Sequence, residues 1–186
     1  TIASSPTEDE VRFGIKHAEK GSAFKNELKS LPVGTLVTAN NLAGDFLLPY
    51  DEKTKLVYIA GGIGITPFRS HLKYLIDNRQ SRNITLFYAV SDPKQIVFKD
   101  ILEEAKDYGL KTVFVLAPPA GQDVPKNWKH EVGYITSDMI RKHVLDYDKR
   151  SYFISGPNAM VQSNKALLRT MGIPRSQIKT DYFSGY

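Results

Sequence analysis

The sequence predicts an α/β protein whose C-terminal part is a doubly wound parallel sheet of five strands. From Leu56 onward, short apolar runs rich in β-branched residues alternate with longer segments whose apolar residues recur every three or four positions. Glycine, proline and helix-capping residues stand at the boundaries between these segments. Strands separated by helices of this length are joined by right-handed crossovers, so we expect a parallel sheet covered on both faces.

The first fifty residues are predicted to be β-rich. Residues 11–15 alternate between apolar and polar or small side chains, and residues 35–39 form a second β-branched run. A third strand is predicted at 45–48, and a short helix with its N-terminus at Ser22. Two or three strands cannot close a barrel, so we expect that the numbering, which starts at Thr1, begins inside a domain. The alternative is a processed or tagged protein whose first residues extend the second domain.

The elements of the C-terminal part follow in regular order. Five strands are predicted, at residues 56–60, 83–90, 111–116, 151–155 and 177–183. Helices are predicted between them, at residues 67–78, 96–108, 138–144 and 158–171. Gly109 and Gly172 stand just after two of these helices, where a left-handed residue commonly ends a helix.

The turn after the first of these strands is the clearest local signal. Thr66 is predicted as the N-cap of the following helix and Pro67 as its first residue. Gly61, Gly62 and Gly64 allow a tight turn and close approach of a ligand, and a helix N-terminus offers free amides to an anion. Because the spacing differs from G-x-G-x-x-G, two interpretations stay open: a loop that binds a dinucleotide pyrophosphate, and a purely structural turn.

Other strand ends point to the same edge of the sheet. Ligands of doubly wound sheets bind at the carboxyl ends of the strands, and the residues there include Ser91-Asp92 and Ser155-Gly156-Pro157. Ser155 is not part of a G-x-S-x-G elbow, which argues against a hydrolase. Met160, one turn into a helix, would pack in the core by default and could instead border a ligand.

Composition restricts the classes that remain. The 25 basic and 20 acidic residues give a net charge of +5 and are interspersed, which indicates a solvated surface or a mildly basic face that steers acidic partners. The sequence contains no basic stripe interleaved with aromatic residues, which argues against nucleic acid binding. The absence of cysteine excludes disulfides and cysteine-ligated iron-sulfur clusters within these residues. Four scattered histidines show no ligand spacing, so no metal site is predicted.

Localisation is expected to be cytoplasmic. No apolar run approaches the about 18 residues of a membrane span, and no charged-then-apolar leader is present. Membrane association through an upstream segment or a partner stays open.

Taken together, the motifs resemble the ferredoxin-NADP reductase superfamily of flavin-dependent NAD(P)H oxidoreductases. Residues 61–67 resemble its nicotinamide-nucleotide loop, and residues 155–160 its C-G-P-x-x-M segment, with serine in place of cysteine. Residues 1–5 resemble the tail of its R-x-[YF]-[ST] flavin motif, and Gly21-Ser22 its pyrophosphate loop. Asp181-Tyr182-Phe183 is similar to its C-terminal acid-x-aromatic element. These features occur in the family's order across the whole chain.

The resemblance implies two domains and an activity. Residues 1–52 would be part of an antiparallel FAD-binding β-barrel, with the arginine and tyrosine of the flavin motif preceding Thr1, and residues 53–186 an NAD(P)-binding domain. The expected enzyme transfers a hydride from NAD(P)H to FAD and passes electrons to an unknown acceptor, a protein or an upstream redox domain. An NAD(P)H-binding sensor or adaptor without turnover is the alternative that the truncated barrel favours. A dehydrogenase acting directly on an organic substrate lacks a plausible acid or base after a strand.

The implied site residues come from several segments. Thr1 and Ser155 would line the hydride path as catalytic residues. Asp92 mildly favours NADH, because a carboxylate repels a 2′-phosphate and accepts from a ribose hydroxyl, whereas Lys94 and Lys99 keep NADPH open. Phe183 or Tyr186 would stack on the isoalloxazine or else pack on the sheet. The implied cofactor-binding residues are Thr1, Ile15, Lys16, Gly21, Ser22, Ala23, Gly61, Gly62, Gly64, Ile65, Thr66, Pro67, Ser91, Asp92, Ser155, Gly156, Pro157, Met160, Phe183 and Tyr186.

Overall fold

The computed structural model describes residues 1–16, 22–39 and 44–183. The chain forms two compact units, one made of Thr1–Gly14 together with Phe46–Tyr186 and the other of Ile15–Asp45.

The smaller unit contains one helix among its described residues, α1 (Ala23–Ser30). Ser22 is its N-cap, as predicted, and the Ser22 hydroxyl oxygen accepts a hydrogen bond from the Lys25 amide at 3.3 Å. No residue of α1 is buried, and Phe24 is 72% exposed. This helix therefore depends on local capping rather than on a core of its own.

The strands predicted in the first fifty residues are largely absent from the structure. Residues 35–39 and 45–48 form no strand, and the strand predicted at 11–15 is reduced to one antiparallel bridge between Ile2 and Phe13. Strand propensity reflects how well a residue fits a paired surface. In the described part of the chain these segments have no ladder to join, so their β-branched composition alone does not produce a sheet.

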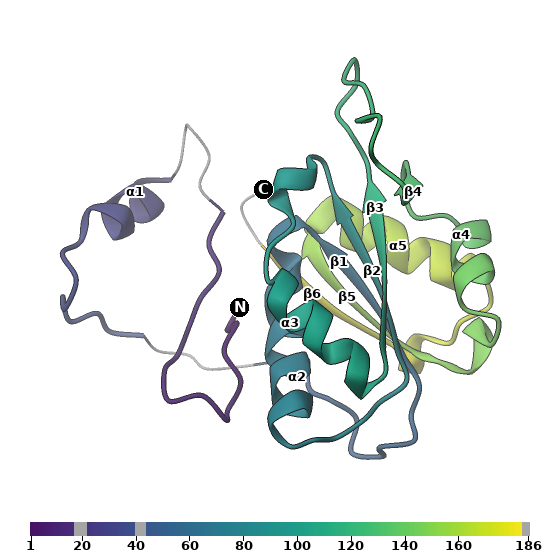
Figure 1. The fold of residues 1–186 in the computed structure, drawn as a ribbon, viewed down its shortest axis with the longest axis horizontal. Helices are drawn as coiled ribbons and strands as arrows, with labels where there is room; N and C mark the ends of the chain where they lie inside the picture. The colour runs from purple at the N-terminus through teal and green to yellow at the C-terminus, as the bar shows by residue number, and fades with distance from the viewer. Residues whose placement is uncertain (17–21, 40–43, 184–186) are drawn as a thin grey trace. The chain divides into compact units, whose positions relative to one another are not determined.

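The larger unit is built on a parallel sheet with the strand order β4-β3-β2-β1-β5-β6 (Figure 1). Its strands are β1 (Leu56–Gly61), β2 (Ile84–Val90), β3 (Leu110–Leu116), β4 (Glu131–Val132), β5 (Ser151–Pro157) and β6 (Ile178–Phe183). The predicted doubly wound α/β class is confirmed. The sheet has one strand more than the five predicted, because β4 is only two residues long and carries no alternating pattern of its own.

Helices cover both faces of the sheet (Figure 1). On one face lie α2 (Thr66–Asp77) and α3 (Lys99–Glu104), and on the other α4 (Ser137–His143) and α5 (Asn158–Thr170). Alternate residues of β1 enter the two cores, Tyr58 on the side of α2 and Ile59 on the side of α5. Every residue of β1 is buried, which explains why this strand is a continuous apolar run in the sequence.

One helix is shorter than predicted. The segment expected to be helical over 96–108 becomes helical only at Lys99, because Phe98 before it adopts a left-handed conformation with φ +56°. A 3₁₀ turn (Ala105–Tyr108) completes the segment, and Gly109, with φ +89°, ends it as predicted. Nowhere in the described residues is there a helix with the length and apolar character needed to cross a bilayer.

Two buried side chains anchor the segment that leads into β1. His71 of α2 bonds through Nε2 to the Phe46 carbonyl oxygen at 2.9 Å, and its Nδ1 lies 3.1 Å from the Tyr58 hydroxyl. Arg82 donates to the carbonyl oxygens of Asp51 and Pro49 at 2.8 and 3.3 Å. The chain before the sheet is thus tied to α2 and to the start of β2.

Candidate functional site

Two loops meet at the carboxyl edge of the sheet, where the strand order reverses beside β1. Ala60 near the end of β1 is in register with Ser155 near the end of β5. A Cβ added to Gly64 would overlap the Ser155 carbonyl oxygen and lie 2.7 Å from the Gly156 Cα. A Cβ on Gly156 would lie 3.2 Å from the backbone nitrogen of Gly61. Only glycine lets these two backbones approach so closely.

The remaining glycines of the turn differ in their surroundings. A Cβ on Gly61 would overlap the sulfur of Met160, so this methionine packs directly against the loop. Gly62 has a left-handed conformation with φ +52°, and no atom lies within 4 Å of its Cβ position. Gly64 is therefore required by packing against backbone atoms, whereas the clash at Gly61 is with the flexible end of a methionine side chain, which can shift. Gly62 is the open point of the turn.

The predicted N-cap role of Thr66 is wrong. A 3₁₀ turn (Gly62–Ile65) runs directly into α2, so Thr66 is already helical and its hydroxyl donates to the Ile63 carbonyl oxygen at 3.0 Å. The helical stretch begins at Gly62, five residues before the predicted first helical residue, Pro67. Pro67, predicted as the first residue of the helix, is its second residue and still lies in the first turn, where its missing N–H costs no hydrogen bond. Ile65, Thr66 and Pro67 are all buried.

Three polar groups from distant parts of the sequence meet beside this turn. The Ser155 side chain is fully buried, and its Oγ has no hydrogen-bond partner among the described residues. Asp181 of β6 is in register with Ser155, so both side chains project from the same face of the sheet. The Thr1 hydroxyl donates to Asp181 Oδ2 at 2.8 Å. Phe153, two residues before Ser155, packs in the core under α2, which identifies this as the α2 face.

The loop after β2 lies at the same edge, because Gly61 is in register with Ala89. Ser91 donates through its hydroxyl to Gln95 Oε1 at 3.1 Å, and Asp92 Oδ1 accepts from the Lys94 amide at 2.8 Å. Asp92 thereby caps a short 3₁₀ turn (Pro93–Gln95). These bonds fix the loop.

The remaining predicted site residues fall into three groups. Ile15, Lys16, Ser22 and Ala23 belong to the smaller unit. Gly21 and Tyr186 lie outside the described residues, and Phe183 is the last residue of β6. Their proposed roles toward a cofactor stay predictions.

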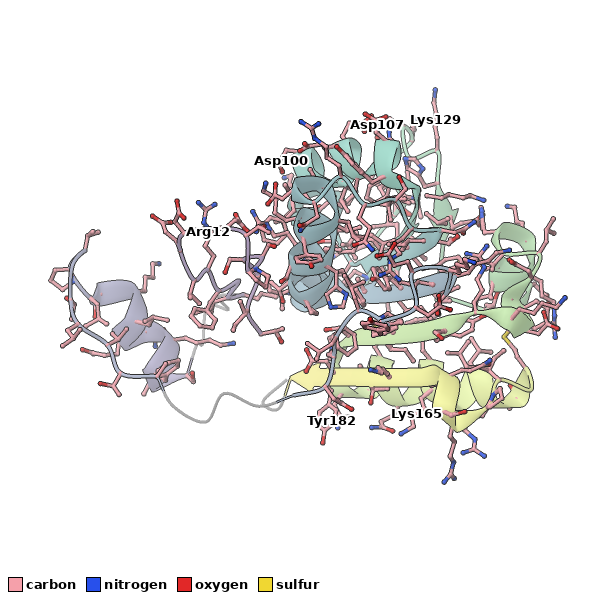
Figure 2. The ribbon with its side chains drawn as sticks, turned by 90° about the horizontal axis from the view of Figure 1, so that it is seen from below. Arg12, Asp100, Asp107, Lys129, Lys165 and Tyr182 are labelled. Atoms are coloured by element: carbon pink, nitrogen blue, oxygen red, sulfur yellow. The ribbon has the colours of Figure 1, made fainter. Side chains whose placement is uncertain are left out.

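Asp181 was predicted only as part of a C-terminal motif and not as a site residue. The structure brings its carboxylate to Thr1 and places it beside Ser155. The sequence feature that could have identified Asp181 as a site residue is its position near the carboxyl end of the last predicted strand. Tyr182, the next residue, is 53% exposed and projects away from the body of the sheet (Figure 2).

A parallel sheet with a glycine turn at the point where the strand order reverses is the arrangement in which doubly wound nucleotide-binding domains bind their ligand. Residues 58–166 match the family described as Oxidoreductase NAD-binding domain. The chain belongs to this family and, with its relatives, to the ferredoxin-NADP reductase superfamily. The superfamily predicted from the motifs is confirmed, and the cofactors of this family are FAD and NAD(P)H.

Individual relatives are distant but extend along nearly the whole chain. A flavohemoprotein of Bacillus subtilis is 25% identical over 184 residues, covering 98% of this chain and 45% of the relative. NADH-cytochrome b5 reductase 1 of Ajellomyces capsulatus is 28% identical over 171 residues, covering 87% and 53%. The crystal structure of a cytochrome P450 reductase from Amycolatopsis has the same fold, with a TM-score of 0.76, 22% identity and coverage of 98% and 55%. The chain spans about half the length of the curated relatives it matches.

Proposed function

We propose that the protein is a flavin-dependent oxidoreductase that takes a hydride from NAD(P)H onto FAD and passes the electrons to a separate acceptor. The observation that carries this proposal is the convergence of Thr1, Asp181 and Ser155 at the carboxyl edge of the sheet. When bound, the nicotinamide supplies a hydride and the flavin accepts it, so the protein contributes positioning and electrostatics. In this proposal residues 1–52 belong to the flavin domain and residues 53–186 to the NAD(P) domain.

The residues at this edge fit a nicotinamide dinucleotide. A buried hydroxyl without a partner is unusual in a folded protein, and Ser155 Oγ is such a group at the reversal of the strand order. We assign to Ser155 Oγ the role of orienting the nicotinamide ring. The turn at Gly62, open on its Cβ side, would hold the pyrophosphate. The Thr1 hydroxyl, held by Asp181, would face the flavin.

The remaining predicted contacts belong to the same proposal. The flavin and its phosphates would contact Ile15, Lys16, Ser22 and Ala23, and the aromatic ring stacked on the flavin would be Phe183 or Tyr186. NADH is the proposed reductant, because the Asp92 carboxylate follows β2 at the edge where the adenosine ribose would lie. One relative is named as an NADH-dependent reductase, which agrees with this choice.

Asp92→Asn is expected to lower the preference for NADH over NADPH about tenfold, measured as the ratio of the two kcat/KM values. Asparagine keeps an oxygen that can accept from the Lys94 amide, so the loop keeps its capping bond while the negative charge is removed. Repulsion of the 2′-phosphate then decreases. Asp92→Ala, which also loses the cap, is the control for loop distortion. An unchanged ratio in Asp92→Asn would show that another group selects the nucleotide.

Ser155→Ala is expected to leave the free energy of unfolding unchanged or to raise it by about 1 kcal/mol, because it removes a buried hydroxyl that has no partner. Hydride transfer is expected to slow about tenfold, since orientation of the ring is lost. Urea denaturation and single-turnover reduction of the flavin measure the two effects. A destabilised variant with an unchanged rate would contradict both expectations.

The function itself is tested by the visible absorption spectrum of the protein expressed with its natural upstream sequence. We expect a flavin spectrum that bleaches when NADH or NADPH is added without oxygen. A protein that binds neither flavin nor nucleotide would refute the proposal. Nucleotide binding without flavin would favour the sensor or adaptor, which the family assignment does not otherwise favour.

The acceptor is proposed to be a redox protein or a second redox domain. Two of the relatives are named as reductases of cytochrome b5 and of cytochrome P450. A cytoplasmic location, with or without association with a membrane, is part of this proposal.

A further inference from the structure

We propose that Arg69 is a positioning residue for hydride transfer. Its guanidinium would hold the N-terminal segment, defined here as residues 1–13, against α2 and so fix the Thr1 hydroxyl at the carboxyl edge of the sheet. The inference deepens the proposed function and rests on it.

Arg69 lies on the first turn of α2 and is only 6% exposed. Its Nη2 donates to Glu8 Oε1 at 2.8 Å, and its Nη1 donates both to Glu8 Oε2 and to the Ala3 carbonyl oxygen, the latter at 3.1 Å. The guanidinium also lies 5.8 Å from the centre of the Phe98 ring. A two-pronged contact of this kind fixes direction as well as distance.

The segment that Arg69 holds is closely packed. Ala3, Ser4 and Ser5 are 2%, 4% and 3% exposed. Ser70, the neighbour of Arg69, donates through its hydroxyl to the Ser4 carbonyl oxygen at 2.7 Å. The Ser5 amide donates to Glu8 Oε2 at 2.7 Å. The Glu8 carboxylate, which accepts from Arg69, therefore also stabilises the turn between Ser5 and Glu8.

The ion pair persists over the working pH range. The hydrogen bond from Arg69 holds the pKa of the Glu8 carboxyl at about 2, against its ordinary value of 4.5, and burial opposes the shift. A buried ion pair is weak evidence for a gain in stability, whereas fixing a register is its best-attested use. The register fixed here is that of residues 1–13 on α2.

Thr1 is therefore held from two sides. The Ala3 carbonyl oxygen, which accepts a hydrogen bond from Arg69, is two residues from Thr1, about 7 Å along an extended chain. The Thr1 hydroxyl itself donates to Asp181 of β6. If Arg69 released the segment, the bonds of Asp181 to Thr1 and of Ser70 to Ser4 would remain, but the Ala3 carbonyl would lose its anchor on α2. A displacement of about 1 Å can cost a hundredfold in rate.

The test compares Arg69→Lys with Arg150→Lys in the protein with its natural upstream sequence. Arg150 is a matched control: it is 7% exposed and donates to Asp146 Oδ1 at 2.7 Å and Asn83 Oδ1 at 2.8 Å. It precedes β5 and so lies at the amino edge, away from the site. In both variants lysine keeps the positive charge but lacks the planar guanidinium that donates to two acceptors at once. Measurements are flavin reduction by NADH in single turnovers, the nucleotide Kd and the urea midpoint.

We expect the rate constant of flavin reduction to fall at least tenfold in Arg69→Lys, with the nucleotide Kd within threefold of wild type. Arg150→Lys should lose stability with an unchanged rate. Glu8→Gln, a milder change of the same contact, should also slow the reaction, and the effects of Glu8→Gln and Arg69→Lys should not add when combined. Amide hydrogen exchange at residues 2–5 should accelerate in Arg69→Lys and not in Arg150→Lys.

Several results would overturn the inference. A wild-type rate in Arg69→Lys and Glu8→Gln would overturn it while leaving the proposed function intact, and so would an equal loss of rate in Arg150→Lys. Wild-type protein whose flavin is reduced by neither NADH nor NADPH would overturn the proposed function and the positioning role with it. Hydrogen exchange would then still report whether Arg69 holds the segment.

Discussion

Gly64→Ala is expected to weaken dinucleotide binding at least a hundredfold and to lower the free energy of unfolding by about 3 kcal/mol. The added methyl group would overlap the Ser155 carbonyl oxygen and lie 2.7 Å from the Gly156 Cα. These atoms cannot move aside easily, because they belong to β5, which is paired with β1 on one side and β6 on the other. The strain would instead separate the two loops that form the candidate site. Isothermal calorimetry with NADH and urea denaturation measure the two effects.

Gly172→Ala is the matched control for this prediction. Gly172 is also a glycine at a structural boundary, with φ +85°, and no atom lies within 4 Å of its Cβ position. Its replacement costs only the backbone strain of a left-handed residue, about 1 kcal/mol, and should leave nucleotide binding unchanged. Wild-type stability and affinity in Gly64→Ala would show that the loops do not need this contact.

The parallel domain could be predicted from the sequence because its signals are local. Each central strand is a short apolar run that ends at a turn, and each helix has its own apolar face. The predicted strand at 83–90 and the observed β2 (Ile84–Val90) differ by one residue. Errors occur where one residue decides a boundary: the left-handed Phe98 shortens α3, and the 3₁₀ turn before Thr66 displaces its predicted cap.

Strands of the first fifty residues could not be predicted reliably, because a strand exists only with a partner. The β-branched composition of 35–39 carries no information on whether such a partner is present. For the same reason the short strand β4 was missed: it exists because Val115 and Leu116 of β3 pair with it.

The candidate site was predicted in part. Ser155 and the glycine turn follow strands, and a parallel sheet brings all such positions to one edge. The contact between Thr1 and Asp181 joins residues 180 positions apart, and that between Arg69 and Glu8 joins residues 61 apart. Neither pair has a spacing or a local pattern that would reveal it, so only the folded chain shows them.

The free energy of unfolding is expected to fall by about 3 kcal/mol between pH 6.5 and pH 4 because of His71 alone. Burial, aided by the charge of Lys179 and opposed by the bond to the Phe46 carbonyl, lowers the pKa of His71 from 6.5 to about 4. Since the unfolded chain takes up the proton first, this contribution is complete above pH 6.5, decreases steadily as the pH falls below 6.5, and is lost once the pH has fallen through the folded pKa of about 4. Because the ring faces a carbonyl acceptor at Nε2, we assign the proton to Nε2 and let Nδ1 accept from the Tyr58 hydroxyl.

His71→Gln separates this effect from the loss of carboxylate pairs at acid pH. Glutamine can donate to the Phe46 carbonyl and accept from Tyr58 without titrating, so the variant should lose stability at pH 7 but show a flatter profile between pH 6.5 and 4.5. The pKa values of Glu8 and Asp146 are lowered to about 2 from 4.5 and 3.8. Both carboxyls therefore stabilise the fold fully at pH values above their ordinary pKa values. This stabilisation is lost mainly below pH 4.5, outside the range from pH 6.5 to 4.5 in which the two profiles are compared. Urea denaturation at half-unit pH intervals measures the profiles, and equal slopes in wild type and His71→Gln would refute the assignment to His71.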